Sequence, residues 1–112
     1  MEKGEDLKQR TKQYALRIIR LVEALPKTQV GYVIGKQLLR CGTSVGANYR
    51  AACRARSVAE FIAKLGIVIE ETDESAFWME MIVESDLMKK ALIEPLLKET
   101  NKILAIMISS SN

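Results

Sequence analysis

Apolar side chains recur at steps of three and four residues along most of the chain, and this spacing restricts the fold more than any other feature. Such a repeat places the apolar residues on one face of an α-helix, which has 3.6 residues per turn. Few positions interrupt it, because the 112 residues include only two prolines and six glycines. The sequence therefore predicts an all-α fold rather than one built from strands and turns.

The first two helices are predicted on either side of Pro26. One extends from about Glu5 to Leu25 and ends there because proline cannot continue it. The next extends from Thr28, a residue suited to an N-cap, to about Ala55. Their predicted core faces are Leu7, Thr11, Tyr14, Ile18, Leu21, Val22 and Leu25 in the first helix, and Val30, Ile34, Leu38, Cys41, Val45 and Ala52 in the second.

The third predicted helix has the clearest start, because Ser57 and Glu60 have the spacing of a capping box, in which each side chain accepts a hydrogen bond from the other residue's backbone. It extends to about Ser85. The fourth begins near Glu94, with Pro95 in its first turn, and the last four residues are expected to fray. The predicted core faces are Phe61, Leu65, Val68, Ile69, Thr72, Ala76, Met79 and Val83 in the third helix, and Leu96, Leu97, Thr100, Ile103, Leu104 and Met107 in the fourth.

Four amphipathic helices with short connections near Pro26 and Arg56 pack as antiparallel neighbours. We therefore predict one domain, residues 1–112, folded as an antiparallel up-down-up-down four-helix bundle. The sequence contains no run of eighteen apolar residues and no signal-peptide pattern. We expect a cytoplasmic protein that does not contact a membrane.

Four glycines of the second predicted helix share one side. Gly31, Gly35, Gly42 and Gly46 fall within an arc of about 60° when residues are placed about 100° apart. Each costs about 1 kcal/mol relative to alanine inside a helix, so the stripe is expected to allow another helix to approach closely. The sequence leaves open whether that helix belongs to the same subunit or to a neighbouring one.

The chain has no histidine, and its two cysteines, Cys41 and Cys53, are predicted to be buried free thiols. Two thiols cannot complete a zinc site, and a disulfide is not expected in a reducing compartment. Neither the thiols nor Ser44 has a histidine that would activate a nucleophile, and no glycine-rich phosphate loop is present. We expect no metal, no cofactor and no enzymatic activity.

Charge is divided unevenly along the chain. Up to Arg56 there are twelve lysines and arginines against four acids, a net +8, and beyond it five against ten, a net −5, which together give +3. One interpretation is that basic helices lie beside acidic ones and the charges compensate. The other is that basic rows on the first two helices contact nucleic-acid phosphates, without reading base sequence. The candidate nucleic-acid-binding residues are Arg10, Arg17, Arg20, Lys36, Arg40, Arg50 and Arg54.

The third predicted helix also carries apolar side chains among glutamates, away from its core face. Ile67, Phe77, Trp78 and Met81 are the candidate oligomer interface, since aromatic and methionine side chains are enriched where proteins meet. A two-fold dimer is the commonest homo-oligomer, whereas separate basic and acidic surfaces also allow a head-to-tail ring. A different protein partner docking near Phe77, Trp78 and Met81 is the competing interpretation.

Several groups of residues between Val30 and Ile82 are specific enough to indicate a family. They are Gln37 and Leu38 with Arg40, Thr43, Ser44 and Val45 with Asn48, Arg54 with Ser57, Phe61, Lys64 and Leu65, and Glu74 with Trp78. With these motifs the chain resembles, over nearly its whole length, the bacterial four-helix bundle family of the 23S ribosomal RNA intervening-sequence proteins. Arg50 and Cys53 depart from the usual pattern, and Arg50 adds positive charge to the outer side of the second helix.

The resemblance implies a small cytosolic bundle that assembles as a ring, a homopentamer. Members of the family are named for reading frames within insertions in 23S rRNA genes, and their biochemical role is poorly defined. A related protein with a similar fold, the accessory variability determinant of diversity-generating retroelements, is associated with a reverse transcriptase and nucleic acid. We therefore expect an oligomer that binds structured RNA or DNA, with a protein-binding scaffold or accessory subunit as the alternative.

Overall fold

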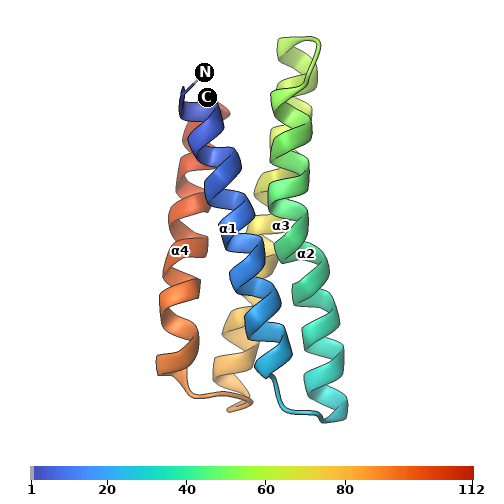
Figure 1. Cartoon of the computed structure of the whole chain (residues 1–112), viewed down its shortest axis with the longest axis vertical. Helices are drawn as coiled ribbons and strands as arrows, with labels where there is room; N and C mark the ends of the chain where they lie inside the picture. The colour runs from blue at the N-terminus through green and yellow to red at the C-terminus, as the bar shows by residue number, and fades with distance from the viewer. Residues whose placement is uncertain (1) are drawn as a thin grey trace.

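The computed structural model describes residues 2–112, and its four α-helices form an antiparallel up-down-up-down bundle (Figure 1). The helices are α1, Glu2–Ala24; α2, Gln29–Cys53; α3, Val58–Glu84; and α4, Lys90–Ser110. The bundle measures 44 × 22 × 20 Å, and the α2–α3 hairpin extends beyond the ends of α1 and α4 (Figure 1). The predicted fold class is confirmed. Within the described residues, no helix combines the length and apolar character needed to span a membrane.

Side-chain caps begin α2 and α3, close to where the sequence predicts them. The Thr28 hydroxyl accepts a hydrogen bond from the Gly31 backbone N–H at 3.1 Å, and the Ser57 hydroxyl accepts one from the Glu60 N–H at 3.0 Å. Of the two hydrogen bonds of the predicted capping box, the one from the Glu60 N–H to Ser57 is present and the reverse one is not. The Glu60 carboxylate accepts a hydrogen bond from the N–H of Arg56 rather than from that of Ser57. The carboxylate therefore still satisfies a backbone donor at this helix start.

The end of α3 requires a left-handed residue. Asp86 has a φ of 59°, and the Leu87 N–H donates to the carbonyl of Ile82 at 3.0 Å while the Asp86 N–H donates to Val83 at 3.1 Å. This is the hydrogen-bond pattern of a Schellman motif, whose left-handed position is usually glycine. The motif turns the chain sharply before α4.

The predicted boundaries of α4 are wrong at both ends. The helix begins at Lys90, so Pro95 is its sixth residue instead of lying in the first turn. Ile93, which precedes the proline, is fully buried and holds the added turn against the core. Pro95 is exposed, where water can satisfy the carbonyl that loses its helical donor. At the other end the helix continues through Ser110, so Ser109 and Ser110 are not frayed.

The core consists largely of the residues that the apolar repeat predicts. Val30 is a wrong prediction: it is 52% exposed because it lies in the first turn of α2, near an end of the bundle. Cys41 is buried as predicted, but the prediction for Cys53 is wrong: it is the last residue of α2 and is exposed, beside the first turns of α1. Tyr49 and Ile82 are buried although the repeat did not include them.

One hydroxyl or thiol from each helix contributes to a polar layer inside the core. The hydroxyls of Tyr14 on α1 and Thr100 on α4 share a hydrogen bond of 2.6 Å, and the Ser75 hydroxyl on α3 donates to Cys41 Sγ on α2 at 3.3 Å. Burial raises the pKa of Tyr14 to about 12, so its phenol stays protonated. Thr100, Ser75 and Cys41 also donate to carbonyls of their own helices, so sliding α1 along α4 would leave the buried Tyr14 hydroxyl unpaired. The Tyr14–Thr100 bond therefore fixes the alignment of these two helices.

The glycine stripe of α2 faces α1 of the same subunit. A Cβ atom on Gly42 would lie 2.8 Å from Ile18, and one on Gly46 would lie 3.1 Å from the Thr11 carbonyl oxygen. Gly35 likewise faces α1, with a Cβ position 3.3 Å from Val22 Cγ1. Of the two interpretations that the sequence leaves open, close packing inside one subunit accounts for the stripe.

Candidate nucleic-acid interface and apolar surface

Arg10 is engaged inside the bundle by an acidic partner on α4. Its Nε and Nη2 atoms donate to the two carboxylate oxygens of Glu99 at 2.9 and 2.8 Å. This bidentate pair holds the pKa of Glu99 below its ordinary value and raises the pKa of Arg10. Arg10 thus joins α1 to α4, which leaves its guanidinium little capacity for a phosphate.

Arg40 is engaged in the same way across α2 and α3. Its guanidinium contacts the carboxylates of Glu71, at 3.4 Å, and of Glu74, and it also donates to the side-chain oxygen of Gln37 at 3.1 Å. The Glu74 carboxylate accepts a further hydrogen bond from Trp78 Nε1 at 3.0 Å. For Arg10 and Arg40, the compensation of basic helices by acidic ones is therefore the observed arrangement.

Arg50 and Arg54 lie in a different setting, a groove between α1 and α2. They line it together with two residues of α1, Lys8 and Lys12, and these four cations define the α1/α2 basic groove. Its volume is about 360 Å³. Arg50 and Arg54 are both exposed. The structure thus brings two of the seven predicted residues together with two lysines that the sequence did not single out.

The α1/α2 basic groove carries an excess of positive charge over a floor of small residues. Lys8 pairs with Glu5 at 2.6 Å, whereas Lys12, Arg50 and Arg54 have no carboxylate within 4 Å among the described residues. The floor is made by Ala15, Thr43, Gly46 and Ala47. Guanidinium and ammonium groups bind phosphate oxygens, and the lining contains no aromatic ring on which a base could stack. The groove can therefore hold a phosphate backbone without reading its sequence.

The sequence did not single out Lys8 and Lys12, because the predicted basic row of the first helix consists of Arg10, Arg17 and Arg20. The two lysines are four residues apart and so share one side of α1. Which side faces α2 depends on how α1 docks, and the close approach at Gly46 sets that docking. The four-residue spacing of Lys8 and Lys12 was visible in the sequence, but the groove that they line forms only when α1 packs on α2.

The other three predicted cations lie apart from this groove. Arg17 and Arg20 line a hollow between α1 and α4, and Lys36 borders one beside the α1–α2 connection. None of the three has an ion pair within the part of the chain that the structure describes. The seven predicted residues therefore do not form one continuous site on a subunit.

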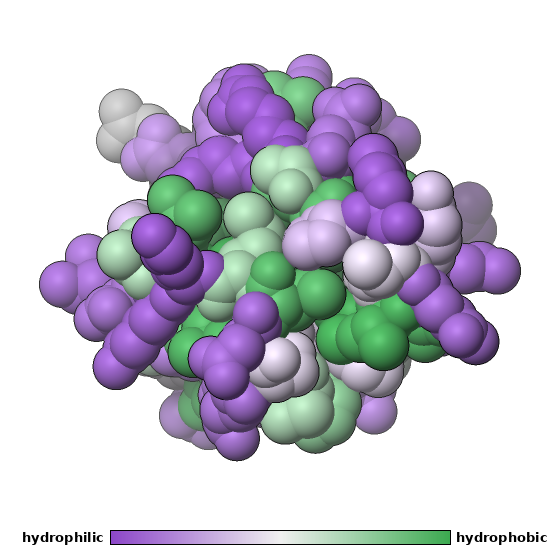
Figure 2. Space-filling view, turned by 90° about the horizontal axis from the view of Figure 1, so that it is seen from below, coloured by the Kyte–Doolittle hydropathy of each residue, from purple (hydrophilic) through white to green (hydrophobic). Residues whose placement is uncertain are grey.

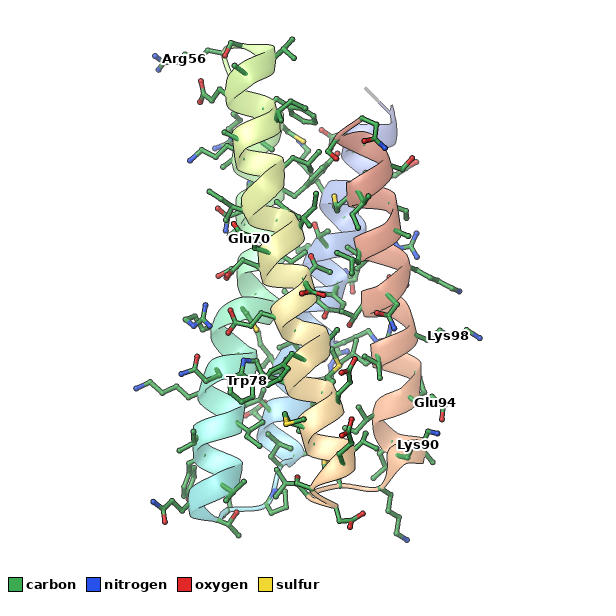
Figure 3. The ribbon with its side chains drawn as sticks, turned by 180° about the vertical axis from the view of Figure 1, so that it is seen from behind. Arg56, Glu70, Trp78, Lys90, Glu94 and Lys98 are labelled. Atoms are coloured by element: carbon green, nitrogen blue, oxygen red, sulfur yellow. The ribbon has the colours of Figure 1, made fainter. Side chains whose placement is uncertain are left out.

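The predicted interface residues of α3 lie on a mixed surface. Ile67 is 39% exposed and Phe77 48% exposed, while Trp78 and Met81 are half-buried and pack against the core. The rings of Phe77 and Trp78 meet edge to face with centroids 5.0 Å apart. The Trp78 side chain lies on the side of α3 that faces α2 (Figure 3). Only Ile67 and Phe77 are thus largely free to contact a partner.

The first turns of α2 add apolar side chains that the sequence did not assign to an interface. Val30, Tyr32 and Val33 are between 52% and 63% exposed. From the end of the bundle that carries the α1–α2 and α3–α4 connections, apolar patches lie between the charged side chains (Figure 2). Val30, Tyr32 and Val33 extend the exposed apolar area beyond α3 and are candidates for protein contact.

Three observations among the described residues concern metal ligands and nucleophiles. No group of three or more Cys, Asp or Glu side chains there could hold a metal ion. Burial raises the pKa of Cys41, which disfavours its reactive thiolate form. Ser44 donates its hydrogen bond to the backbone carbonyl of Arg40 at 2.6 Å, within its own helix.

The chain is similar to known proteins over nearly its whole length. The sequence model of a family described as "23S rRNA-intervening sequence protein" matches residues 5–109. A crystal structure of a protein of unknown function from the S23 ribosomal protein family, from Bacteroides thetaiotaomicron, is 34% identical in sequence and superposes with a TM-score of 0.90. That match covers 97% of this chain and 97% of the other. No curated protein matches the sequence.

Proposed function

The chain belongs to the 23S rRNA-intervening sequence protein family, and from this premise we propose that it is a non-enzymatic oligomeric protein that binds structured RNA or another nucleic acid. The observation that carries the proposal is the α1/α2 basic groove, where Lys12, Arg50 and Arg54 have no acidic partner among the described residues. Binding would occur through phosphates, because the groove offers cations and no stacking surface.

Assembly strengthens the proposal, because one groove supplies few contacts. In a homo-oligomer, such as the homopentamer that the family resemblance implies, each subunit repeats the α1/α2 basic groove. Several grooves that engage one nucleic acid bind more tightly than a single groove, with no new contact in any subunit. The proposed location is the cytoplasm, where structured RNA is available.

The direct test is fluorescence anisotropy of nuclease-treated protein with a labelled structured RNA and with a duplex DNA. The variant Arg50→Glu/Arg54→Glu reverses the two unpaired arginines of α2 and is expected to weaken binding at least about tenfold at moderate salt. Arg40 is left intact, since its substitution would also break the ion pairs to Glu71 and Glu74. Circular dichroism and analytical ultracentrifugation establish that helicity and assembly persist.

A matched control carries the same change in net charge elsewhere. Lys90 and Lys98 point away from the bundle on α4 (Figure 3), so Lys90→Glu/Lys98→Glu is expected to change affinity by less than about threefold. Equal weakening in both variants would mean that only net charge matters. Unchanged affinity in Arg50→Glu/Arg54→Glu would reject the groove as the binding site.

A second candidate function is a protein-binding scaffold, or an accessory subunit of an enzyme such as a reverse transcriptase, with no nucleic-acid contact. The exposed Phe77 ring against Trp78 favours it. Trp78 fluorescence distinguishes the two uses of this surface. A spectral shift when subunits dissociate on dilution assigns the surface to assembly, whereas an unchanged spectrum leaves it open to another protein.

A further inference from the structure

The seam between α1 and α4 is where two adjacent helices of the bundle come close at the fewest positions. These helices approach each other at fewer positions than any pair of consecutive helices does, and Figure 1 shows them separating toward the end that carries the two connections. Near the middle of the seam, Arg10 pairs with Glu99 and Tyr14 bonds to Thr100. Beyond that point the two helices leave a hollow.

This seam hollow has an apolar floor and a basic rim. Its volume is about 410 Å³. The rim carries Arg17 and Arg20, and the aliphatic lining comes from both helices and the α3–α4 connection: Leu21, Met88, Leu92 and Leu96. Leu92 is 62% exposed, a large fraction for a leucine that faces a groove. A hollow of this kind places unburied apolar area beside two cations.

The chemistry of the seam hollow suits a protein better than a nucleic acid. A phosphate backbone gains nothing from an aliphatic floor, and the lining has no aromatic ring on which a base could stack. Leucine-sized side chains would bury the floor. Arg17 and Arg20, three residues apart on one side of α1, have no carboxylate partner among the described residues, and each can donate two hydrogen bonds to a carboxylate.

We propose that the seam hollow binds an amphipathic helix of a partner protein, with aliphatic side chains on the inserted face and aspartate or glutamate beside them. Charge complementarity to Arg17 and Arg20 selects the acidic flank. A groove between two antiparallel helices accepts a third helix through residues spaced three and four apart. The site is separate from the α1/α2 basic groove, so this inference does not depend on the proposed nucleic-acid function.

The test uses the full chain and two synthetic helical peptides of about 18 residues, roughly five turns. Both peptides carry leucines at steps of three and four, with glutamates on the flanks in one and lysines in the other. Anisotropy measures affinity, and backbone amide shifts in 15N NMR spectra locate the contact. The glutamate peptide is expected to bind at least about tenfold more tightly than the lysine peptide and to shift the amides of residues that line the seam hollow.

Variants on each side of the hollow sharpen the test. Arg17→Glu/Arg20→Glu and Leu92→Glu are each expected to weaken binding of the glutamate peptide about tenfold or more. Leu92 is largely exposed, so its substitution leaves the core intact, and circular dichroism checks the fold of the variant. Arg50→Glu/Arg54→Glu, with the same charge change in the other groove, is the matched control and should change affinity less than about threefold.

Three results would overturn the inference. Equal affinity for the two peptides, or no effect of Arg17→Glu/Arg20→Glu, would show that the rim does not select acidic helices. Dissociation of the protein's own assembly by Leu92→Glu, with no peptide binding to the wild type, would assign the hollow to a second copy of this chain. Loss of RNA binding in Arg17→Glu/Arg20→Glu, again with no peptide binding, would assign it to nucleic acid.

Discussion

Replacing Gly42 by alanine tests how closely α1 packs on α2. The new Cβ atom would lie 2.8 Å from both Cγ1 and Cγ2 of Ile18 and 3.0 Å from its Cδ1. Ile18 is fully buried and β-branched, so it has few other rotamers to adopt. Either α1 moves away or Ile18 becomes strained, and overpacking of this kind costs about 1–3 kcal/mol.

The expected net effect includes a favourable contribution from helix propensity. Alanine is about 1 kcal/mol better than glycine inside a helix, so Gly42→Ala should lower the free energy of unfolding by a net of about 1 kcal/mol, within a range of about 0–2. Gly66→Ala is the matched control, because no atom lies within 4 Å of its Cβ position on α3. It should raise the free energy of unfolding by about 0.5–1 kcal/mol. The difference between the two variants isolates the overpacking.

The assay is urea unfolding followed by circular dichroism, at one fixed protein concentration because the stability of a protein that self-associates depends on its concentration. Repeating Gly42→Ala in an Ile18→Ala background completes a double-mutant cycle, in which the penalty should disappear. Gly42→Ala that stabilises as much as Gly66→Ala, or a penalty that survives the removal of Ile18, would refute the reasoning.

Further substitutions test the polar layer, the end of α3 and the ion pair. Tyr14→Phe removes the buried hydrogen bond to Thr100 and should lower the free energy of unfolding by about 1 kcal/mol in the same assay, with no further loss when Thr100→Val is added. Asp86→Gly relieves a left-handed backbone and should raise it by about 0.5–1 kcal/mol, measured by thermal unfolding; a loss of stability would contradict the cap geometry. Arg10 holds the pKa of Glu99 below its ordinary 4.5, so the pair stabilises the fold at neutral pH, and the contribution is lost as the pH falls below 4.5 through the folded-state pKa. The stability difference between the wild type and Glu99→Gln should therefore shrink between about pH 7 and pH 3, and a difference independent of pH would count against the ion pair.

The helices were predictable where local patterns act alone. The apolar repeat identified α1 with its full core face, and Thr28 and Ser57 marked the starts of α2 and α3 through their caps. The start of α4 was not predictable in this way, because the buried side chain of Ile93 outweighs the preference of Pro95 for a first turn. Tertiary packing decided that boundary.

The candidate sites were predictable only in part, since they depend on how the helices dock. Charge spacing found Arg50 and Arg54, but Lys8 and Lys12 joined them only through the packing of α1 on α2. Arg40 looked the same in the sequence, and its acidic partners come from α3, 31 and 34 residues further along the chain. Sequence spacing along one helix carries no information about such partners.

The most direct test of the proposed function is the salt dependence of binding to a duplex nucleic acid, compared between the wild type and Arg50→Ala/Arg54→Ala. Each phosphate contact contributes about 0.9 to the slope of the logarithm of the association constant against the logarithm of salt concentration for B-form DNA. If both arginines of the α1/α2 basic groove contact phosphates, the variant's slope should be shallower by about 1.8 or more. An unchanged slope, or no binding by the wild type at low salt, would contradict the account.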